Sequence, residues 1–289
     1  MGLTLTVFTP TYNRLSLLKR CHESLLSQTR QDFCWLIVDD GSTDGTGEEV
    51  QRWRQDSPFP IEYMWQENGG KMRAHNTGVK HTETPLFVCL DSDDYFTKAA
   101  VNDILCKWSE AGGDPKCGGI VAHKGSDEKR PLYGEDFPSI EKSTLSNLYN
   151  KGFHGETTLV YRTDLLKKHP FPEIKGEKYV PEDYVYDQID REAYLAVLPE
   201  ILTVCELIGE GYTDRVEELR RENPTGWYLY YVNRARFTGN SLLRLKYLSH
   251  CLRFSKAADP YTVSREGLPW HLKLLGLPGA ICLTIMRKL

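Results

Sequence analysis

Three carboxylates stand together in LDSDDY, residues 90–95, directly after the apolar run PLFVCL. Like charges at short range repel one another and are costly to desolvate, so Asp91, Asp93 and Asp94 require a compensating interaction. Capping of a following helix is one alternative, although one acid suffices for it. A divalent metal is the other, because Mg²⁺ and Mn²⁺ bind carboxylate oxygens and keep positions open for phosphates. The candidate metal ligands are Asp93 and Asp91, either of which could instead accept a hydrogen bond from a sugar hydroxyl.

Two further polar loops follow apolar runs in the same way. VDDGSTD places Asp39 and Asp40 after CWLIV, where a carboxylate could accept from a base N–H or a ribose hydroxyl. TPTYNR offers a stiff turn at Pro10 and an aromatic face at Tyr12, which suit a nucleobase. These loops predict a nucleotide site.

A glycine pair precedes two cations in NGGKMRAHN. Lys71 and Arg73 would face a diphosphate there, although a solvated helix start is the alternative. The segment is not a P-loop, because no GKS or GKT follows, and the chain lacks the GxGxxG dinucleotide fingerprint.

Strand and helix signals alternate along the first 111 residues. Apolar runs predict strands and helical spacing predicts helices, at 3–8, 33–40, 61–66 and 85–90 for the strands and at 16–28, 48–56, 71–82 and 98–111 for the helices. This order predicts an α/β fold with a mixed, mostly parallel sheet and flanking helices. Ligands bind such sheets at the carboxyl ends of the strands, so the three polar loops should converge.

The rest of the chain changes character. The charged, turn-rich segment 122–139 is expected to be a surface loop, and a helical C-terminal extension is expected after Gly211. We therefore expect one domain over 1–210, with a change of character between 1–110 and 111–210, and a helical extension over 211–289.

Composition excludes several classes of protein. The 289 residues carry a net charge of -4, which argues against a nucleic-acid partner. We expect neither a signal peptide nor a membrane-spanning segment. Eight cysteines without a CxxC pair indicate reduced thiols in the cytoplasm and no zinc site.

The motifs FTPTYNR, LLSQT, FCWLIVDDGSTDGT, NGGK, AHNTGV and FVCLDSDDYF occur in this order and spacing. Together they resemble the nucleotide-sugar half of a family 2 glycosyltransferase with the GT-A fold. The resemblance covers about the first hundred residues. It implies a GT-A-like (Rossmann-like) catalytic domain over 1–210, with the nucleotide sugar bound by 1–110 and the acceptor by 111–210. A looser similarity to the acceptor segment of bacterial polysaccharide enzymes covers 159–189, and the last third resembles nothing informative.

The resemblance implies roles for individual residues. Asp40 would meet the base with support from Asp39, Asp91 would touch the ribose, and Asp93 would ligate Mn²⁺ or Mg²⁺ at the diphosphate. The other residues that it places at the nucleotide sugar, most simply a UDP-sugar, are Thr9, Pro10, Tyr12, Arg14, Asn68, Lys71, Arg73, Asn76 and Ser92. His75 stands where family members often carry Arg, so a packed histidine is the simpler interpretation.

Members of this family invert the anomeric centre in a single displacement, which requires a general base. VPEDYVYDQ offers Asp183 and Glu182, and helical geometry lets only one of the two face the acceptor. We expect Asp183, with Glu182 as the rival. The alternative is that both acids simply favour a helix N-terminus.

The C-terminal tail mixes apolar residues from Trp270 onward with His271, Lys273, Arg287 and Lys288. It could lie on the inner face of the cytoplasmic membrane, or pack against the chain or a second copy in a homo-oligomer. Gly276, Pro278 and Gly279 are expected to interrupt any long helix.

The predicted function is an inverting, metal-dependent transfer of a sugar to a glycan or lipid-linked acceptor in cell-surface polysaccharide synthesis. A non-catalytic sugar-nucleotide sensor or partner subunit is the alternative. A nucleotidyltransferase is disfavoured, because TPTYNR is not a glycine-rich basic loop.

Overall fold

The computed structural model describes residues 2–205 and 215–286, and the chain divides into two compact units. The first unit comprises Met1–Pro170 and Ile189–Leu207, and the second comprises Phe171–Gln188 and Ile208–Leu289. Residues 171–188 thus group with the C-terminal helices rather than with the sheet. The expected boundary at 210/211, like Arg287 and Lys288, lies outside the described residues.

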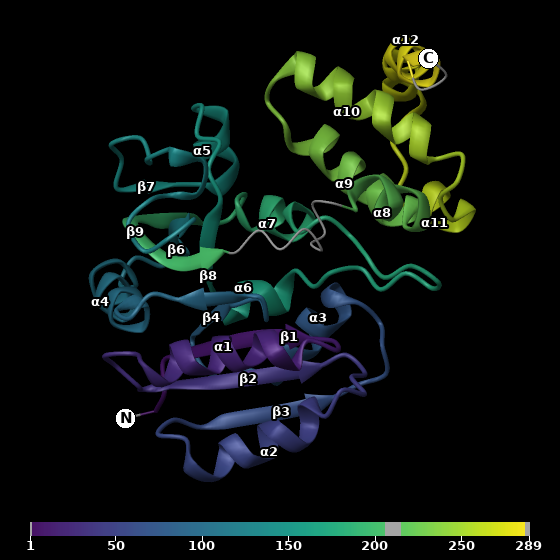
Figure 1. Ribbon diagram of the computed structural model, residues 1–289. Helices are drawn as coiled ribbons and strands as arrows, with labels where there is room; N and C mark the ends of the chain where they lie inside the picture. The colour runs from purple at the N-terminus through teal and green to yellow at the C-terminus, as the bar shows by residue number, and fades with distance from the viewer. Residues whose placement is uncertain (1, 206–214, 287–289) are drawn as a thin grey trace. The chain divides into compact units, whose positions relative to one another are not determined.

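The first unit contains a mixed sheet flanked by helices (Figure 1). Its strands are β1 (Leu5–Thr11), β2 (Phe33–Asp39), β3 (Ile61–Trp65), β4 (Leu86–Cys89), β5 (Asp94–Phe96), β6 (Cys117–Gly125), β7 (Lys142–Ser143), β8 (Thr157–Arg162) and β9 (Tyr194–Cys205). Its helices are α1 (Leu15–Leu26), α2 (Thr46–Asp56), α3 (Lys71–His81), α4 (Ala100–Ala111), the 3-10 turn η1 (Leu132–Gly134), α5 (Leu145–Asn150) and α6 (Thr163–Lys168).

The sheet has the order β3-β2-β1-β4-β8-β6-β9-β5, and β7 pairs with β9. Strands β3, β2, β1 and β4 are mutually parallel, whereas β8 is antiparallel to β4 and β6. The expected α/β fold with a mixed sheet is confirmed. The expectation that the loop begins at residue 122 is wrong, because β6 continues to Gly125 and pairs with β8 and β9.

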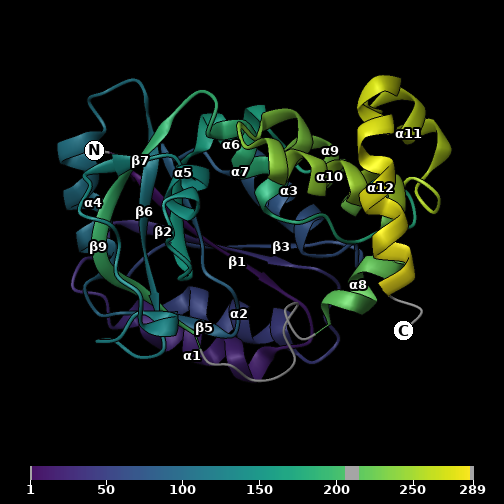
Figure 2. The same cartoon turned by 90° about the horizontal axis from the view of Figure 1, so that it is seen from above.

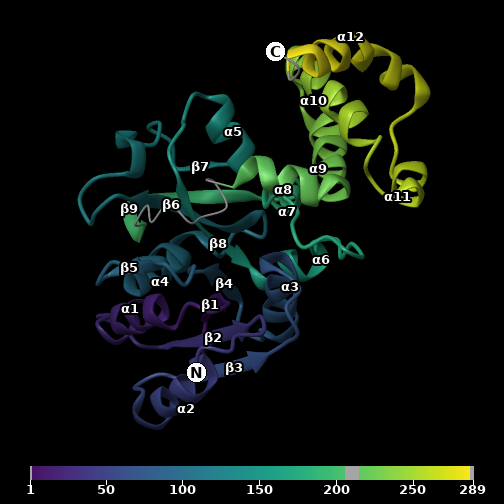
Figure 3. The same cartoon turned by 45° about the vertical axis from the view of Figure 1, so that its right-hand side comes forward.

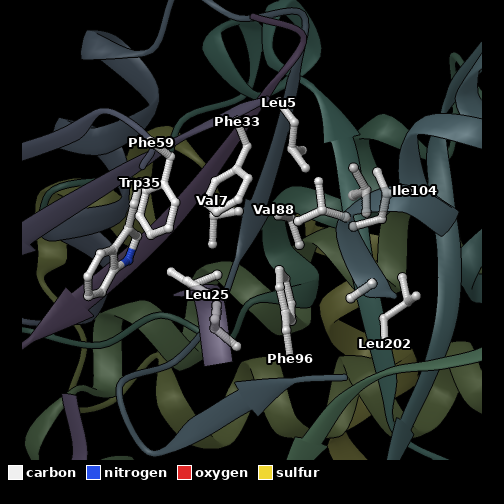
Figure 4. Packing of buried hydrophobic residues seen from close by; sticks show 14 of the residues in the cluster. Leu5, Val7, Leu25, Phe33, Trp35, Phe59, Val88, Phe96, Ile104 and Leu202 are labelled. Atoms are coloured by element: carbon white, nitrogen blue, oxygen red, sulfur yellow. The ribbon is translucent and has the colours of Figure 1, made fainter. Parts of the chain in front are cut away.

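Strand β1 is buried along its whole length, because helices cover both faces of the parallel strands. Alternate residues of a strand point to opposite faces. Val7 joins the apolar cluster that includes Leu25 of α1, whereas Phe8 contacts Gly78 and His75 of α3. Figure 2 shows α1 and α3 on opposite sides of β1. Figure 4 shows the α1 side of this core, to which Trp35, Phe33 and Val88 all belong.

The second unit is helical. Its helices are α7 (Asp183–Ile189), α8 (Val216–Glu222), α9 (Pro224–Phe237), α10 (Ser241–Phe254), α11 (Pro260–Arg265) and α12 (Trp270–Met286). An aromatic cluster with Trp227, Tyr231 and Phe254 forms its core. Helix α12 packs against α10, as Figure 3 shows.

The expected interruption of the tail helix is wrong, because α12 is continuous through Pro278. A side chain at Gly276 would collide with the backbone of Leu248, and one at Gly279 would collide with Ser249. The two glycines therefore allow close packing on α10, which stabilises the helix despite the backbone hydrogen bond that a proline cannot make. No helix in the described ranges is long and apolar enough to cross a membrane.

Candidate active site

Parallel pairing brings the loops after β1, β2 and β4 to one edge of the sheet. The ladder continues to this edge, where the Asp40 amide donates to the Thr11 carbonyl at 2.9 Å and the Leu90 amide donates to the Phe8 carbonyl at 2.8 Å. The three polar loops therefore meet at the carboxyl ends of these strands, as the sequence predicts.

The loop after β1 is fixed by Asn13, which has a left-handed φ of 51°. Its side-chain oxygen accepts from the Thr43 amide at 2.8 Å, and its own amide donates to Ser42 Oγ at 2.9 Å. The first loop is thereby attached to the second. This attachment sets the position of Arg14, which follows directly, and leaves the Tyr12 ring exposed.

Each carboxylate of the acidic turn, residues 91–94, has a cationic partner from a distant element. Lys71 Nζ lies 2.7 Å from Asp91 Oδ1, Arg14 Nη1 lies 2.7 Å from Asp93 Oδ2, and Lys124 Nζ lies 3.0 Å from Asp94 Oδ2. A fourth cation, Arg20, donates to the backbone carbonyl of Asp93. The compensation that the acids require is therefore supplied by the chain itself.

These cations change the acid–base properties of the turn. Burial acts to raise the pKa of Asp91, but the charges of Lys71 and Lys124 outweigh it and hold that pKa below its usual range. Burial acts to lower the pKa of Lys124, yet the carboxylates of Asp94 and Asp91 raise it well above the ordinary value. Asp91 and Lys124 are therefore both charged at neutral pH.

The capping alternative for the acidic turn is wrong. Residues Asp94–Phe96 form β5, and α4 begins only at Ala100 with Ala99 at its N-cap. None of the three acids lies next to that N-terminus.

Asp40 holds the neighbouring loop within the chain. Its carboxylate accepts from the amides of Gly69 and Gly70 at 2.9 and 2.7 Å and from Gln66 Nε2 at 2.6 Å. The amide of Asn68 donates to the Asp40 carbonyl at 2.8 Å. A carboxylate accepts about four hydrogen bonds, so its predicted contact with a base would use the remaining lone pair.

Asp39 is also engaged inside the protein. It is 1% exposed and accepts from the Ser42 amide and the Tyr63 hydroxyl, both at 2.7 Å. Its predicted role in supporting Asp40 remains a prediction.

Other predicted nucleotide residues differ in their surroundings. Thr9 is fully buried, and its hydroxyl accepts from the Trp35 indole at 2.9 Å, so contact with a base would require this core bond to open. Arg73 lies against Gly69. The remaining residues are Pro10 and Ser92, which are buried, and Asn76, which is half-buried on α3. His75 packs edge-on against Phe8 and Phe87, the packed interpretation expected for it.

The predicted base candidates belong to the second unit. Asp183 is the first residue of α7, and its carboxylate is paired with Arg234 of α9. Arg234 also lies 2.9 Å from Asp187 and sits over the Tyr230 ring. Glu182 precedes the helix, and its carbonyl accepts from the Val185 amide at 3.0 Å. Asp183 is thus both at a helix N-terminus and oriented by an ion pair.

The donor set at the acidic turn fits a divalent metal that is shared with a ligand. The described residues contain no group of three or more His, Cys, Asp or Glu suited to holding an ion. Mg²⁺ in phosphate-binding sites commonly takes only one or two carboxylates together with substrate oxygens and water. Asp93 and Asp91 could provide those carboxylates, although Arg14 and Lys71 now contact them.

Lys124 and Arg20 are the residues that sequence reasoning missed. Lys124 comes two residues after the run GGIVA, whose apolar residues could have predicted a strand reaching it. Arg20 lies on α1, and no local signal distinguishes it from a solvated residue.

A sequence model of the family described as "Glycosyl transferase family 2" matches residues 6–169. The glycosyltransferase GlyG of Streptococcus pneumoniae serotype 4 is 28% identical over 183 residues, which cover 60% of this chain. The chain spans only 60% of the length of that relative.

Two solved structures resemble the whole chain in fold. S. aureus TarS 1-349 in complex with UDP-GlcNAc has a TM-score of 0.64 at 20% identity, covering 96% of this chain and 79% of that one. The mannosyltransferase PcManGT from Pyrobaculum calidifontis, in complex with GDP-Man and Mn²⁺, has a TM-score of 0.57 at 19% identity, covering 98% and 81%. These identities support the fold alone.

Proposed function

Because the chain belongs to glycosyl transferase family 2, we propose that it transfers a sugar from a nucleotide sugar to an acceptor hydroxyl. The observation that carries this proposal is the acidic turn at the carboxyl edge of the parallel strands, surrounded by Arg14, Arg20 and Lys71. A GT-A-like fold positions a nucleotide sugar at this edge.

We propose UDP as the nucleotide. A TarS structure contains UDP-GlcNAc, and TarS is similar to this chain in fold. The exposed Tyr12 ring offers a stacking surface for the base. Asp91 is charged and lies at the edge, where it can accept hydrogen bonds from ribose hydroxyls. Arg14 and Lys71 supply positive charge for the diphosphate.

Asp93, with Asp91, would hold Mn²⁺ or Mg²⁺ at the diphosphate. A divalent ion stabilises the negative charge that develops on the departing nucleoside diphosphate. The chain's own part is to orient the two carboxylates, and the paired cations on Lys124 and Arg20 fix the turn that bears them.

Asp183 would act as the general base, removing the proton of the acceptor hydroxyl as it attacks, with Glu182 as the rival. Transfer by a single displacement inverts the anomeric carbon. Arg234 supports this assignment because it fixes the Asp183 carboxylate. The acceptor would be a hydroxyl on a glycan or lipid-linked chain in cell-surface polysaccharide synthesis.

Peripheral membrane contact through α12 fits such an acceptor. Trp270, Leu274, Leu275 and Leu277 are exposed on this helix. Residues 240–289 contain eight Lys or Arg against two Asp or Glu, while the whole chain is at -4. Basic segments with exposed apolar residues bind anionic membrane surfaces.

Flotation with vesicles tests the contact. We expect the protein to float with phosphatidylglycerol vesicles and not with phosphatidylcholine vesicles, and Trp270→Ser with Leu274→Ser to abolish flotation. If the double variant floats as well as the unchanged protein does, membrane contact through α12 is contradicted.

Turnover tests the proposed transfer. Purified protein with Mn²⁺ should slowly hydrolyse one UDP-sugar, with water taking the sugar in place of the acceptor hydroxyl, and so release UDP. Asp93→Asn should remove about 10²-fold or more of this activity. Asp164→Asn is the matched control, because Asp164 forms an exposed ion pair with Arg162 outside the site. Binding without turnover would favour the sensor or partner subunit.

A further inference from the structure

The acidic turn is surrounded by positive charge before any ligand binds. Three carboxylates, on Asp91, Asp93 and Asp94, face four cationic side chains among the described residues, on Arg14, Arg20, Lys71 and Lys124. A bare divalent cation approaching this cluster meets net repulsion. A diphosphate, or a metal that arrives with one, does not.

Arg14 is the cation that pairs with Asp93, the first of the two proposed metal ligands. Its Nη1 lies 2.7 Å from Asp93 Oδ2, and the two side chains are 34% and 20% exposed. Solvent therefore screens the pair only partly. Arg14 follows the left-handed Asn13, whose bonds to Ser42 and Thr43 fix the backbone from which the Arg14 side chain reaches Asp93.

We propose that Arg14 competes with the metal for Asp93, so that this protein takes up a divalent cation together with the diphosphate and not alone. The proposal rests on the proposed metal role of Asp93. A guanidinium at a carboxylate opposes a second cation there. When the diphosphate binds, it offers Arg14 a new bidentate partner and frees Asp93.

Arg14 thereby couples the two ligands. An effect of the nucleotide on metal affinity must equal the effect of the metal on nucleotide affinity. Removing Arg14 should change the two affinities in opposite directions, because the metal loses a competitor and the diphosphate loses a partner. General damage to the site would lower both.

The test is a titration of Mn²⁺ by electron paramagnetic resonance, in the absence and presence of UDP. We expect Arg14→Gln to bind Mn²⁺ about tenfold more tightly than the wild type without UDP, from removal of one charge at this distance. With Mn²⁺ present, the same variant should bind UDP about tenfold more weakly. Arg14→Lys keeps the charge without the planar fork, so it should bind free Mn²⁺ nearly as the wild type does and UDP more weakly.

Arg52→Gln is the control for net charge, because Arg52 is exposed on α2 and pairs with Glu49. It should leave both affinities unchanged. Unchanged or weaker binding of free Mn²⁺ by Arg14→Gln would overturn the competition.

Asp93→Asn in the Arg14→Gln background separates this inference from the proposed metal site. If Asp93→Asn removes Mn²⁺ binding while Arg14→Gln alone does not strengthen it, the metal site stands and the competition fails. If Asp93→Asn leaves Mn²⁺ binding intact, the proposed metal role of Asp93 fails, and the competition fails with it.

Discussion

The Lys124 ammonium lies 3.0 Å from the Asp94 carboxylate, and both side chains are largely shielded from solvent at 21% and 8% exposure. Cys205 donates from its thiol to the same carboxylate oxygen at 3.3 Å. Strand β6 supplies Lys124 and strand β5 supplies Asp94, so this pair ties the acidic turn to the antiparallel half of the sheet.

Lys124→Met should therefore destabilise the protein. It leaves the Asp94 carboxylate buried without a counter-charge, which we expect to cost about 2–3 kcal/mol of the free energy of unfolding. Urea denaturation followed by tryptophan fluorescence measures this. Lys124→Arg should lose less, and Asp94→Asn combined with Lys124→Met should recover part of the loss. Full stability of Lys124→Met would show that the pair contributes nothing.

Asp40→Asn tests whether Asp40 acts chiefly on the loop or on the base. The substitution replaces one of the two carboxylate oxygens, which accept from the Gly69 and Gly70 amides, by an NH₂ group that can only donate. The variant should therefore lose about 1–3 kcal/mol of stability. The Gly70 backbone, with φ of 91°, also needs these bonds to stay in place. Unchanged stability with weakened UDP binding would instead assign Asp40 to the nucleotide.

His22 should make the first unit sensitive to acid. The ring packs against the rings of Trp53 and Trp35, with centroids 4.2 and 5.4 Å away, and burial lowers its pKa to about 4. The unfolded chain binds a proton at an ordinary pKa near 6.5 and the folded chain does not. The free energy of unfolding is therefore highest above pH 6.5. It falls by up to about 3 kcal/mol as the pH drops to about 4.

Urea midpoints measured from pH 4 to pH 7.5 check this slope. His22→Phe keeps an aromatic ring but cannot bind a proton. The slope of the unfolding free energy with pH should therefore fall by the amount that corresponds to about one proton. His154→Phe, at an exposed histidine of the same unit, should leave the slope as it is. An unaltered slope in His22→Phe would contradict the assignment.

The base assignment can be separated from binding. Asp183→Asn should reduce the rate of transfer by about 10²–10⁴ while leaving the affinity for UDP and Mn²⁺ unchanged. Glu182→Gln should have a smaller effect on transfer. Single-turnover rates with a saturating UDP-sugar give the comparison. Full turnover in both variants would exclude both residues.

Local sequence was sufficient to predict the strands and the edge of the sheet at which their loops meet. The apolar runs before Asp39 and Asp91 mark strands, and parallel pairing then requires their loops to meet. The family and its fold followed from the same motifs. Helix α12 shows the limit of this reasoning, because its continuity through Pro278 depends on glycine contacts with α10.

The partners of the acidic turn could not be predicted in this way. Arg14, Lys71 and Lys124 lie 79, 20 and 30 residues from the acids they contact, so their pairing is fixed only by the tertiary fold. Asp40 shows the complementary limit. A carboxylate that follows a strand looks the same in sequence whether it binds a ligand or the amides of its own chain.

The most direct test of the nucleotide-sugar site is thermal stabilisation by a panel of UDP-, GDP- and dTDP-sugars, with Mn²⁺ or with EDTA. A ligand that binds only the folded chain raises its stability by mass action. We predict that one UDP-sugar raises the melting temperature with Mn²⁺ and much less with EDTA, and that Asp93→Asn loses this difference while Asp164→Asn keeps it. No shift with any sugar nucleotide at about 100 times a micromolar Kd would contradict the account.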